Sequence, residues 1–172
     1  MPYTAKAYTL HQIVVMATPL TERLFGLRLS EDVTDSVEYV VDRLRAASPN
    51  RLRPVIVGQV NDLVSDAQYL FETQNLHHLP VVSGVKVVGI VSSTDILRLY
   101  MDSPLIDPDE VLLEHIMTPN PELIYNDAPI KELVHRLANS AFRCLPVLDR
   151  NDELWDIVTT RDLVRFLELV YC

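Results

Sequence analysis

Two short motifs place a hydroxyl and a carboxylate three residues apart, Ser92-x-x-Asp95 and Thr159-x-x-Asp162. Each follows a β-branched run and precedes an amphipathic one, so each is expected where a strand gives way to a helix. A helix N-terminus offers N–H groups and partial positive charge to a phosphate, and a carboxylate accepts hydrogen bonds from both hydroxyls of a ribose. The same spacing is also that of a capping box, which serves only the helix. Both interpretations fit the motifs.

The other reactive side chains form no comparable arrangement. His77 and His78 are adjacent, so on a strand they point to opposite faces and are poorly placed to chelate one metal. One of them can contact a phosphate, or both can be solvent-exposed without a role. Cys144 follows Arg143, which can lower a thiol pKa, but its place before an apolar run favours a structural thiol. With no triad or carboxylate pair, the sequence predicts neither an enzyme nor a metal site.

Composition excludes several classes of protein. The 172 residues carry a net charge of −9, which disfavours nucleic-acid binding. Four glycines form neither GxGxxG nor GxxxxGK[ST], so the two commonest phosphate loops are absent. The apolar stretch at about residues 10–20 is too short to span a membrane and contains Pro19. Two cysteines without a CxxC motif indicate a reducing compartment, and a cytoplasmic protein is expected.

The chain contains an internal duplication. Residues 78–82 (HLPVV) resemble 144–148 (CLPVL), and residues 89–95 (GIVSSTD) resemble 156–162 (DIVTTRD). The prolines of the first pair are 66 residues apart and the final aspartates of the second pair are 67 apart. Two motifs that recur in the same order at nearly one offset indicate two copies of one structural unit.

Each copy has the pattern of a β-α-β-β-α unit. A leading strand (55–57 or 123–125) is followed by a helical apolar stripe, a hairpin and an amphipathic helix. Such a unit is too small to bury both faces of its sheet, so the copies are expected to pack as a pseudo-two-fold pair in an α/β (α+β) fold. The predicted organisation is an N-terminal extension (1–50), repeat 1 (51–101), a linker (102–110) and repeat 2 (111–172).

The extension is expected to contain a helix at about residues 31–47, capped by Ser30. Its apolar stripe should pack on the body of the protein or on a second subunit. The stripe consists of Val33, Val37, Val40, Val41 and Leu44.

The order of proline motif, hairpin, G-h-V-[ST]-x-x-D and helix, present twice, resembles a tandem pair of CBS domains, the Bateman module. The resemblance covers roughly residues 51–172. It implies a regulatory module that binds adenosine compounds such as AMP, ADP, ATP or S-adenosylmethionine, that forms homodimers, and that is not itself an enzyme. An adenine nucleotide would then be a regulatory ligand, with no cofactor required. The regulated effector protein is not identified by the sequence.

The resemblance also assigns roles to individual residues. Asp95 and Asp162 would bind ribose hydroxyls. The phosphate would lie near Ser92, Thr94, Thr159, Arg161, Arg143, His77 and His78. The adenine would contact Ile90, Ile157, Leu76, Thr118, Phe142 and Cys144. Each cleft in this family joins the aspartate motif of one repeat to the segment before the proline of the other, so Asp162 should share a cleft with residues 76–78. Asp95 should share one with Thr118 and residues 142–144.

One position departs from the pattern. The motif glycine of repeat 1, Gly89, is replaced in repeat 2 by Asp156. Asp156 would either obstruct the Asp162 cleft and add negative charge to it, or point outward and leave it intact. The sequence therefore predicts a nucleotide sensor that acts by rearranging a dimer of CBS pairs. The alternative is a structural dimerisation or docking module with degenerate clefts.

Overall fold

The computed structural model describes residues 36–48, 55–139 and 143–171. All of them belong to one structural unit, Ser36–Cys172. Ser30, Val33, Phe142 and Cys172 lie outside the described residues, so the expectations that concern them are not addressed by the structure.

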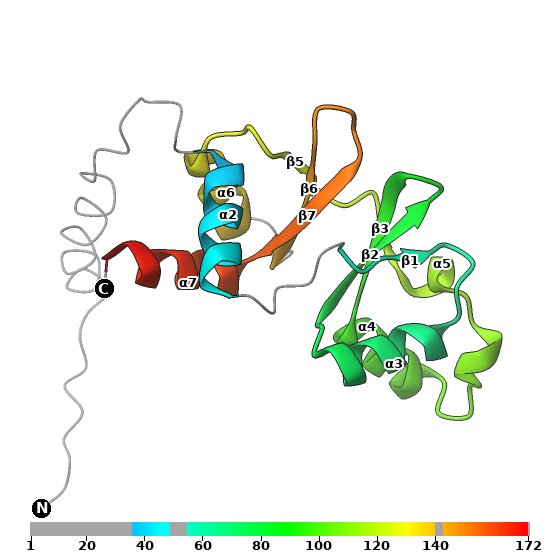
Figure 1. Cartoon of the computed structure of the whole chain (residues 1–172). Coiled ribbons are helices and arrows are strands. Elements are labelled where there is room, and N and C mark those ends of the chain that lie inside the picture. The colour runs from blue at the N-terminus through cyan, green and yellow to red at the C-terminus, as the bar shows by residue number, and fades with distance from the viewer. Residues whose placement is uncertain (1–35, 49–54, 140–142, 172) are drawn as a thin grey trace, which may run out of the picture. The chain divides into compact units, whose positions relative to one another are not determined.

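The described chain contains two copies of the same element order (Figure 1). Helix α2 (Val37–Ala47) precedes them. The first copy comprises β1 (Gly58–Gln59), α3 (Val64–Gln74), β2 (His78–Ser83), β3 (Lys86–Ser92) and α4 (Ser93–Asp102). The second comprises β5 (Ile124–Tyr125), α6 (Ile130–Asn139), β6 (Cys144–Leu148), β7 (Leu154–Thr159) and α7 (Thr160–Tyr171). Between them lie η1 (Pro108–Glu110), α5 (Leu113–Ile116) and β4 (Thr118–Pro119). The predicted pair of β-α-β-β-α units is confirmed.

The two sheets have the same pairing. In each, the leading strand is parallel to the second strand, and the hairpin strands are antiparallel. The hairpin register shifts at Val81/Val82 in one copy and at Val147/Leu148 in the other, which is the same place in both repeats. The leading strand expected at residues 55–57 instead begins at Gly58, which pairs with Val81. A Cβ atom at this position would lie 2.5 Å from Cδ1 of Leu113, so α5 approaches the strand closely and a larger residue here would have to displace the Leu113 side chain.

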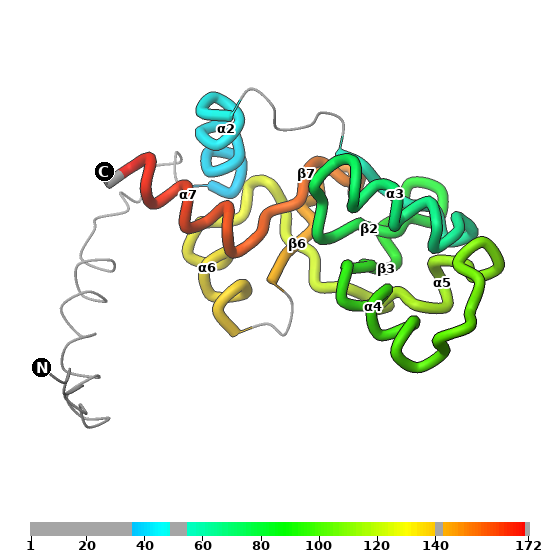
Figure 2. The backbone as a smooth tube through the Cα atoms, turned by 90° about the horizontal axis from the view of Figure 1, so that it is seen from below, coloured from blue at the N-terminus to red at the C-terminus, as the bar shows by residue number. Residues whose placement is uncertain are grey.

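Each repeat is completed by the segment that precedes the other one. The amide of Val37, at the start of α2, donates to the carbonyl of Ala128 in the second repeat (2.9 Å). In the equivalent contact, the amide of Leu113 donates to the carbonyl of Asp62 in the first repeat (2.9 Å). Strand β4 then pairs with β3, which extends the first sheet to four strands. Both views show α2 beside α6 and α7 (Figures 1 and 2).

Helix α2 is shorter than predicted at its N-terminus and packs on the body. It begins at Val37, because Ser36 is extended and its hydroxyl accepts a hydrogen bond from the amide of Tyr39. The buried residues of α2 are Val37, Val40, Val41 and Leu44. They share a core with residues of the second repeat that include Ile124, Leu133, Leu145, Val158 and Phe166. A separate core in the first repeat includes Val64, Leu79, Val91 and Leu113.

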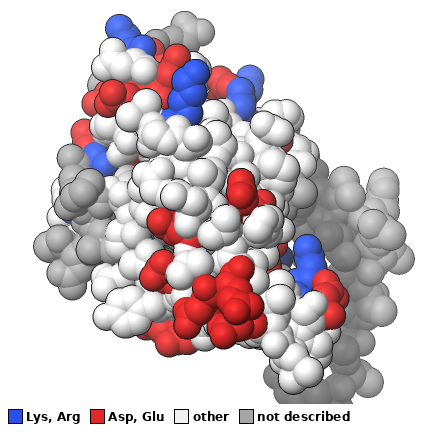
Figure 3. Space-filling view, turned by 90° about the vertical axis from the view of Figure 1, so that its right-hand side faces the viewer, with Lys and Arg blue, Asp and Glu red and all other residues white. Residues whose placement is uncertain are grey.

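The surface is unevenly charged. Residues 55–119 contain nine Asp and Glu but only Lys86 and Arg98 as basic residues. Acidic side chains gather on the face drawn in Figure 3, where basic ones are fewer. This distribution is unfavourable for contact with a nucleic-acid backbone. Within the described ranges, no helix is long and apolar enough to cross a membrane.

Candidate functional site

Both hydroxyl–carboxylate motifs form capping boxes. Oδ2 of Asp95 accepts hydrogen bonds from the amide and the hydroxyl of Ser92, at 2.8 and 2.6 Å. Oδ2 of Asp162 accepts the equivalent bonds from Thr159, at 2.8 and 2.7 Å. The capping interpretation is therefore correct for both motifs. A capping role does not by itself exclude ligand binding, because a carboxylate can accept several hydrogen bonds at once.

The first amide of each helix is already occupied. The amide of Ser93 in α4 donates to the carbonyl of His77 (3.3 Å), and the amide of Thr160 in α7 donates to the carbonyl of Arg143 (2.9 Å). These two amides are therefore not available to a phosphate, although N–H groups at a helix N-terminus were expected to be available. The bonds instead join each helix to the segment before the proline of its own repeat.

A cavity of about 990 Å³ lies between the two repeats. The first repeat contributes Val55, Ile56 and residues 74–78, and the second contributes Leu137, Ala138, Arg143, residues 156–157 and residues 159–162. Helix α3 ends at Gln74, and the capping residue Asn75 has a left-handed conformation (φ 52°) that turns the chain into this wall. The cavity thus brings together the residues predicted for the Asp162 cleft. They are Leu76, His77, His78, Ile157, Thr159, Arg161 and Asp162.

The residues predicted for the Asp95 cleft are placed differently. Ser92, Thr94 and Asp95 do not line this cavity, whereas Arg143, which was assigned to the Asp95 cleft, does. Ile90 is 4% exposed and pairs with Thr118 in the sheet. Cys144 is 1% exposed, and burial raises the pKa of its thiol to about 12. This thiol is protonated at neutral pH, which argues against the nucleophile considered from the sequence.

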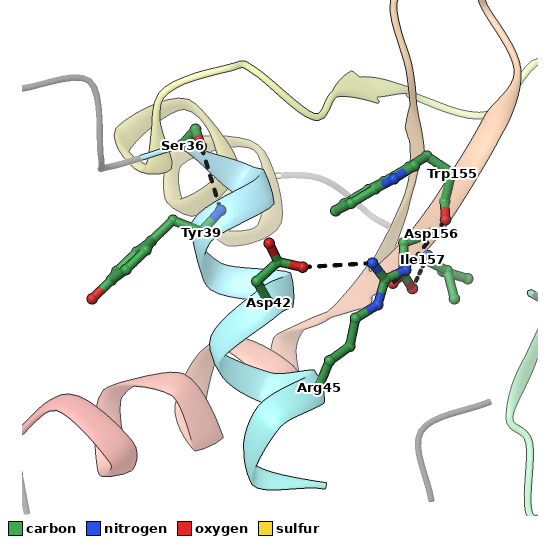
Figure 4. Close-up of polar contacts among 7 residues, drawn as sticks. All are labelled: Ser36, Tyr39, Asp42, Arg45, Trp155, Asp156 and Ile157. Carbon is green, nitrogen blue, oxygen red and sulfur yellow. Dashed lines mark hydrogen bonds and ion pairs between the residues drawn. The ribbon is translucent and has the colours of Figure 1, made fainter. Parts of the chain in front are cut away.

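Neither of the two alternatives expected for Asp156 is what the structure shows. The residue lines the cavity, but its charge is paired with a cation. Its carboxylate is buried at the cavity wall and forms an ion pair with Arg45 of α2, with Nη2 2.5 Å from Oδ2 (Figure 4). The Arg45 guanidinium also lies 4.5 Å from the centre of the Trp155 ring. Oδ1 of Asp156 accepts a hydrogen bond from the amide of Ile157 (2.7 Å).

Sequence reasoning did not identify Arg45. It lies on an N-terminal helix more than a hundred residues away from Asp156, and only the packing of α2 on the second repeat brings the two together. At the equivalent place in the first repeat, Gly89 leaves room for Met117, whose Sδ lies where a side chain would begin. The equivalent position is thus packed against Met117 in the first repeat and paired with Arg45 in the second.

His78 is the cavity residue with a clear electrostatic perturbation. Partial burial lowers its pKa from the ordinary value of 6.5, and the neighbouring charges of His77 and Arg143 lower it further, whereas Asp95 raises it. His78 is therefore neutral at pH 7 in the folded protein. No group of three or more His, Cys, Asp or Glu side chains in the described residues is arranged to hold a metal ion.

Acidification is expected to destabilise the protein through His78. Because its pKa is lower in the folded state, the unfolded chain binds a proton more readily once the pH falls below about 6.5. The contribution of His78 is complete above that pH and is lost as the pH falls toward the folded-state pKa. The melting temperature should therefore drop more between pH 7.5 and pH 5.5 in the wild type than in His78→Gln. The exposed His115, changed to Gln, is the control, and an equal fall in all three proteins would contradict the prediction.

Comparison with known proteins identifies related sequences and structures. The family model for the CBS domain matches residues 52–102 and 113–169. An uncharacterized 17.7 kDa protein of Acidianus ambivalens is 30% identical over 114 residues, which are 66% of this chain and 67% of that protein. Several other curated relatives are much longer, and the chain spans about a fifth of their length.

Two solved structures similar to this chain contain ligands. CBSX2, a CBS-pair protein of Arabidopsis thaliana, was solved in complex with AMP. It is 26% identical, with a TM-score of 0.60, over 70% of this chain and 92% of CBSX2. The CBS domain pair of protein MJ0100 was solved with 5′-methylthioadenosine and S-adenosyl-L-methionine. It is 26% identical, with a TM-score of 0.59, over 67% of this chain and 93% of that one.

Proposed function

The chain belongs to the CBS-domain family, with two copies of the domain in tandem, and we propose that it is a regulatory module whose cavity binds an adenine nucleotide. One observation carries the proposal. The cavity places the capping motif of the second repeat, Thr159 and Asp162, opposite residues 76–78 of the first. A ligand in this position would contact both repeats at once.

The cavity has the chemistry that a nucleoside phosphate requires. Asp162 supplies a carboxylate for the ribose hydroxyls, and Ile157 supplies an apolar surface for the base. Arg143 and Arg161 line the same cavity and can bind phosphate oxygens through charge-assisted hydrogen bonds. Its volume is at the upper end of the range for small-molecule sites, about 300–1,000 Å³. AMP, ADP and ATP fit this charge pattern better than the neutral nucleoside. The AMP complex of CBSX2 supports the class of ligand.

Binding would act by favouring one arrangement of the repeats. A ligand shifts such an equilibrium only by its difference in affinity for the two arrangements, and contacts to both walls provide that difference. We also propose a homodimer, because Leu97 and Met101 on α4 and Val164 on α7 are large apolar side chains that are 59%, 74% and 62% exposed. An effector protein would respond by binding one arrangement of the repeats more tightly than the other.

A structural module without a ligand is the second candidate. It is favoured by the capping boxes, because Ser92, Asp95, Thr159 and Asp162 already have a role in helix stability. In this alternative the repeats would serve dimerisation or docking alone. The two candidates differ in one measurable property, which is the response of the protein to nucleotides.

The decisive experiment is a titration of the purified protein with AMP, ADP, ATP and S-adenosylmethionine. Adenosine and GMP serve as controls for the phosphate and the base. A ligand at a hundred times its Kd should raise the free energy of unfolding by about 2.7 kcal/mol, which calorimetry and thermal melts would detect. Sedimentation of the same samples reports the dimer. No binding of any adenine compound would contradict the proposal and favour the structural module.

A further inference from the structure

The wall of the cavity contains a carboxylate whose counter-charge comes from outside both repeats. Asp156 lines the cavity and its side chain is 5% exposed. Its cation, Arg45, is 11% exposed and belongs to α2, which precedes both repeats in the sequence. The charge that a ligand meets at this wall therefore depends on whether α2 is docked.

Loss of Arg45 would make the potential at this wall more negative, because Asp156 would lose the positive charge that Arg45 supplies. A more negative wall disfavours the binding of a phosphate, and this effect is larger in a partly buried site than in bulk water. Arg45 suits the counter-charge role because its guanidinium is held over the Trp155 ring and also donates to the Trp155 carbonyl (3.5 Å).

We infer that α2 influences the cavity through Arg45, a positioning residue that offsets the charge of Asp156 and so favours the binding of an anionic ligand. This inference rests on the proposed nucleotide site. Linkage makes the effect reciprocal: an anion in the cavity stabilises the docked helix, and removal of the helix weakens the binding of the anion. The element that reports occupancy to a partner is then α2.

The test compares a charged and a neutral ligand in matched variants. Arg45→Met removes the cation and keeps most of the side-chain volume. Arg45→Met combined with Asp156→Asn removes both charges and keeps an oxygen that accepts the Ile157 amide. Arg45→Lys is the conservative variant. AMP and adenosine are titrated into each protein by calorimetry.

We expect Arg45→Met to weaken AMP binding by about tenfold or more, which corresponds to about 1.4 kcal/mol, with a much smaller effect on adenosine. The double variant and Arg45→Lys should recover AMP affinity to within a few-fold of the wild type. A purely structural role for Arg45 would weaken both ligands alike, which would overturn the inference. If Arg45→Met does not fold, the double variant decides: AMP affinity that stays tenfold weaker there also overturns it.

Amide hydrogen exchange on the wild type gives an independent readout. AMP should slow exchange in residues 37–47 of α2, although α2 does not line the cavity. Unchanged exchange in α2 with AMP bound would overturn the inference and leave the nucleotide site intact. A wild-type protein that binds no nucleotide would instead contradict the proposed function, and the inference with it.

Discussion

Replacement of Leu44 by alanine is expected to lower the free energy of unfolding by about 2–5 kcal/mol, the range for large-to-small changes at fully buried leucines. Leu44 is 1% exposed and lies in the same core as Leu133 and Leu145 of the second repeat. The cavity left by the missing atoms would open where α2 meets the sheet and helices of that repeat. Urea unfolding followed by circular dichroism measures the loss.

The matched control is Leu97→Ala. Leu97 also lies on a helix, but its side chain is 59% exposed, so the same change should cost no more than about 0.5 kcal/mol. A similar, small loss for Leu44→Ala would mean that α2 does not pack on the second repeat in solution. The proposed control of the cavity through Arg45 would then lack its structural basis.

The elements within each repeat could be predicted because their signals are local. The apolar stripe of α6, the alternating hairpin runs and the Ser92/Asp95 and Thr159/Asp162 motifs each lie within a dozen residues. The duplication strengthened these signals, since a weak stripe in α3 could be compared with a strong one in α6. The bounds moved at Gly58 and Ser36, where pairing with another segment decides the first residue. The short elements α5 and β4, which complete the first repeat, were not predicted.

The contacts between segments far apart in the sequence could not be predicted. The apolar stripe of α2 predicts that this face is covered, but the stripe alone does not distinguish the second repeat from another subunit as the surface that covers it. The environment of Asp156 also depends on a contact with a residue far away in the sequence. Whether a carboxylate at a motif glycine obstructs, faces solvent or is neutralised depends on Arg45, and the two meet only when α2 docks. The assignment of Arg143 changed for a related reason, since it lines the cavity formed with the second motif.

The second large effect concerns the two aspartates that the sequence could not rank. Asp162→Ala is expected to abolish the stabilisation by AMP, about 2.7 kcal/mol at a hundred times Kd, because the carboxylate proposed for the ribose is lost. Asp95→Ala is the matched variant. It removes the same capping bonds from α4 but leaves the lining of the cavity unchanged.

The comparison separates capping from ligand binding. Without ligand, both variants should lose about 1 kcal/mol of stability, the usual contribution of a capping side chain. With AMP, Asp95→Ala should regain stability as the wild type does, and Asp162→Ala should not. Thermal melts with and without AMP measure both quantities. If AMP stabilised Asp162→Ala as fully as the wild type, Asp162 would not be a ligand-binding residue. If AMP failed to stabilise Asp95→Ala, the first motif would be the one that binds the nucleotide. The cavity geometry favours Asp162, because its capping motif and residues 76–78 line the same cavity.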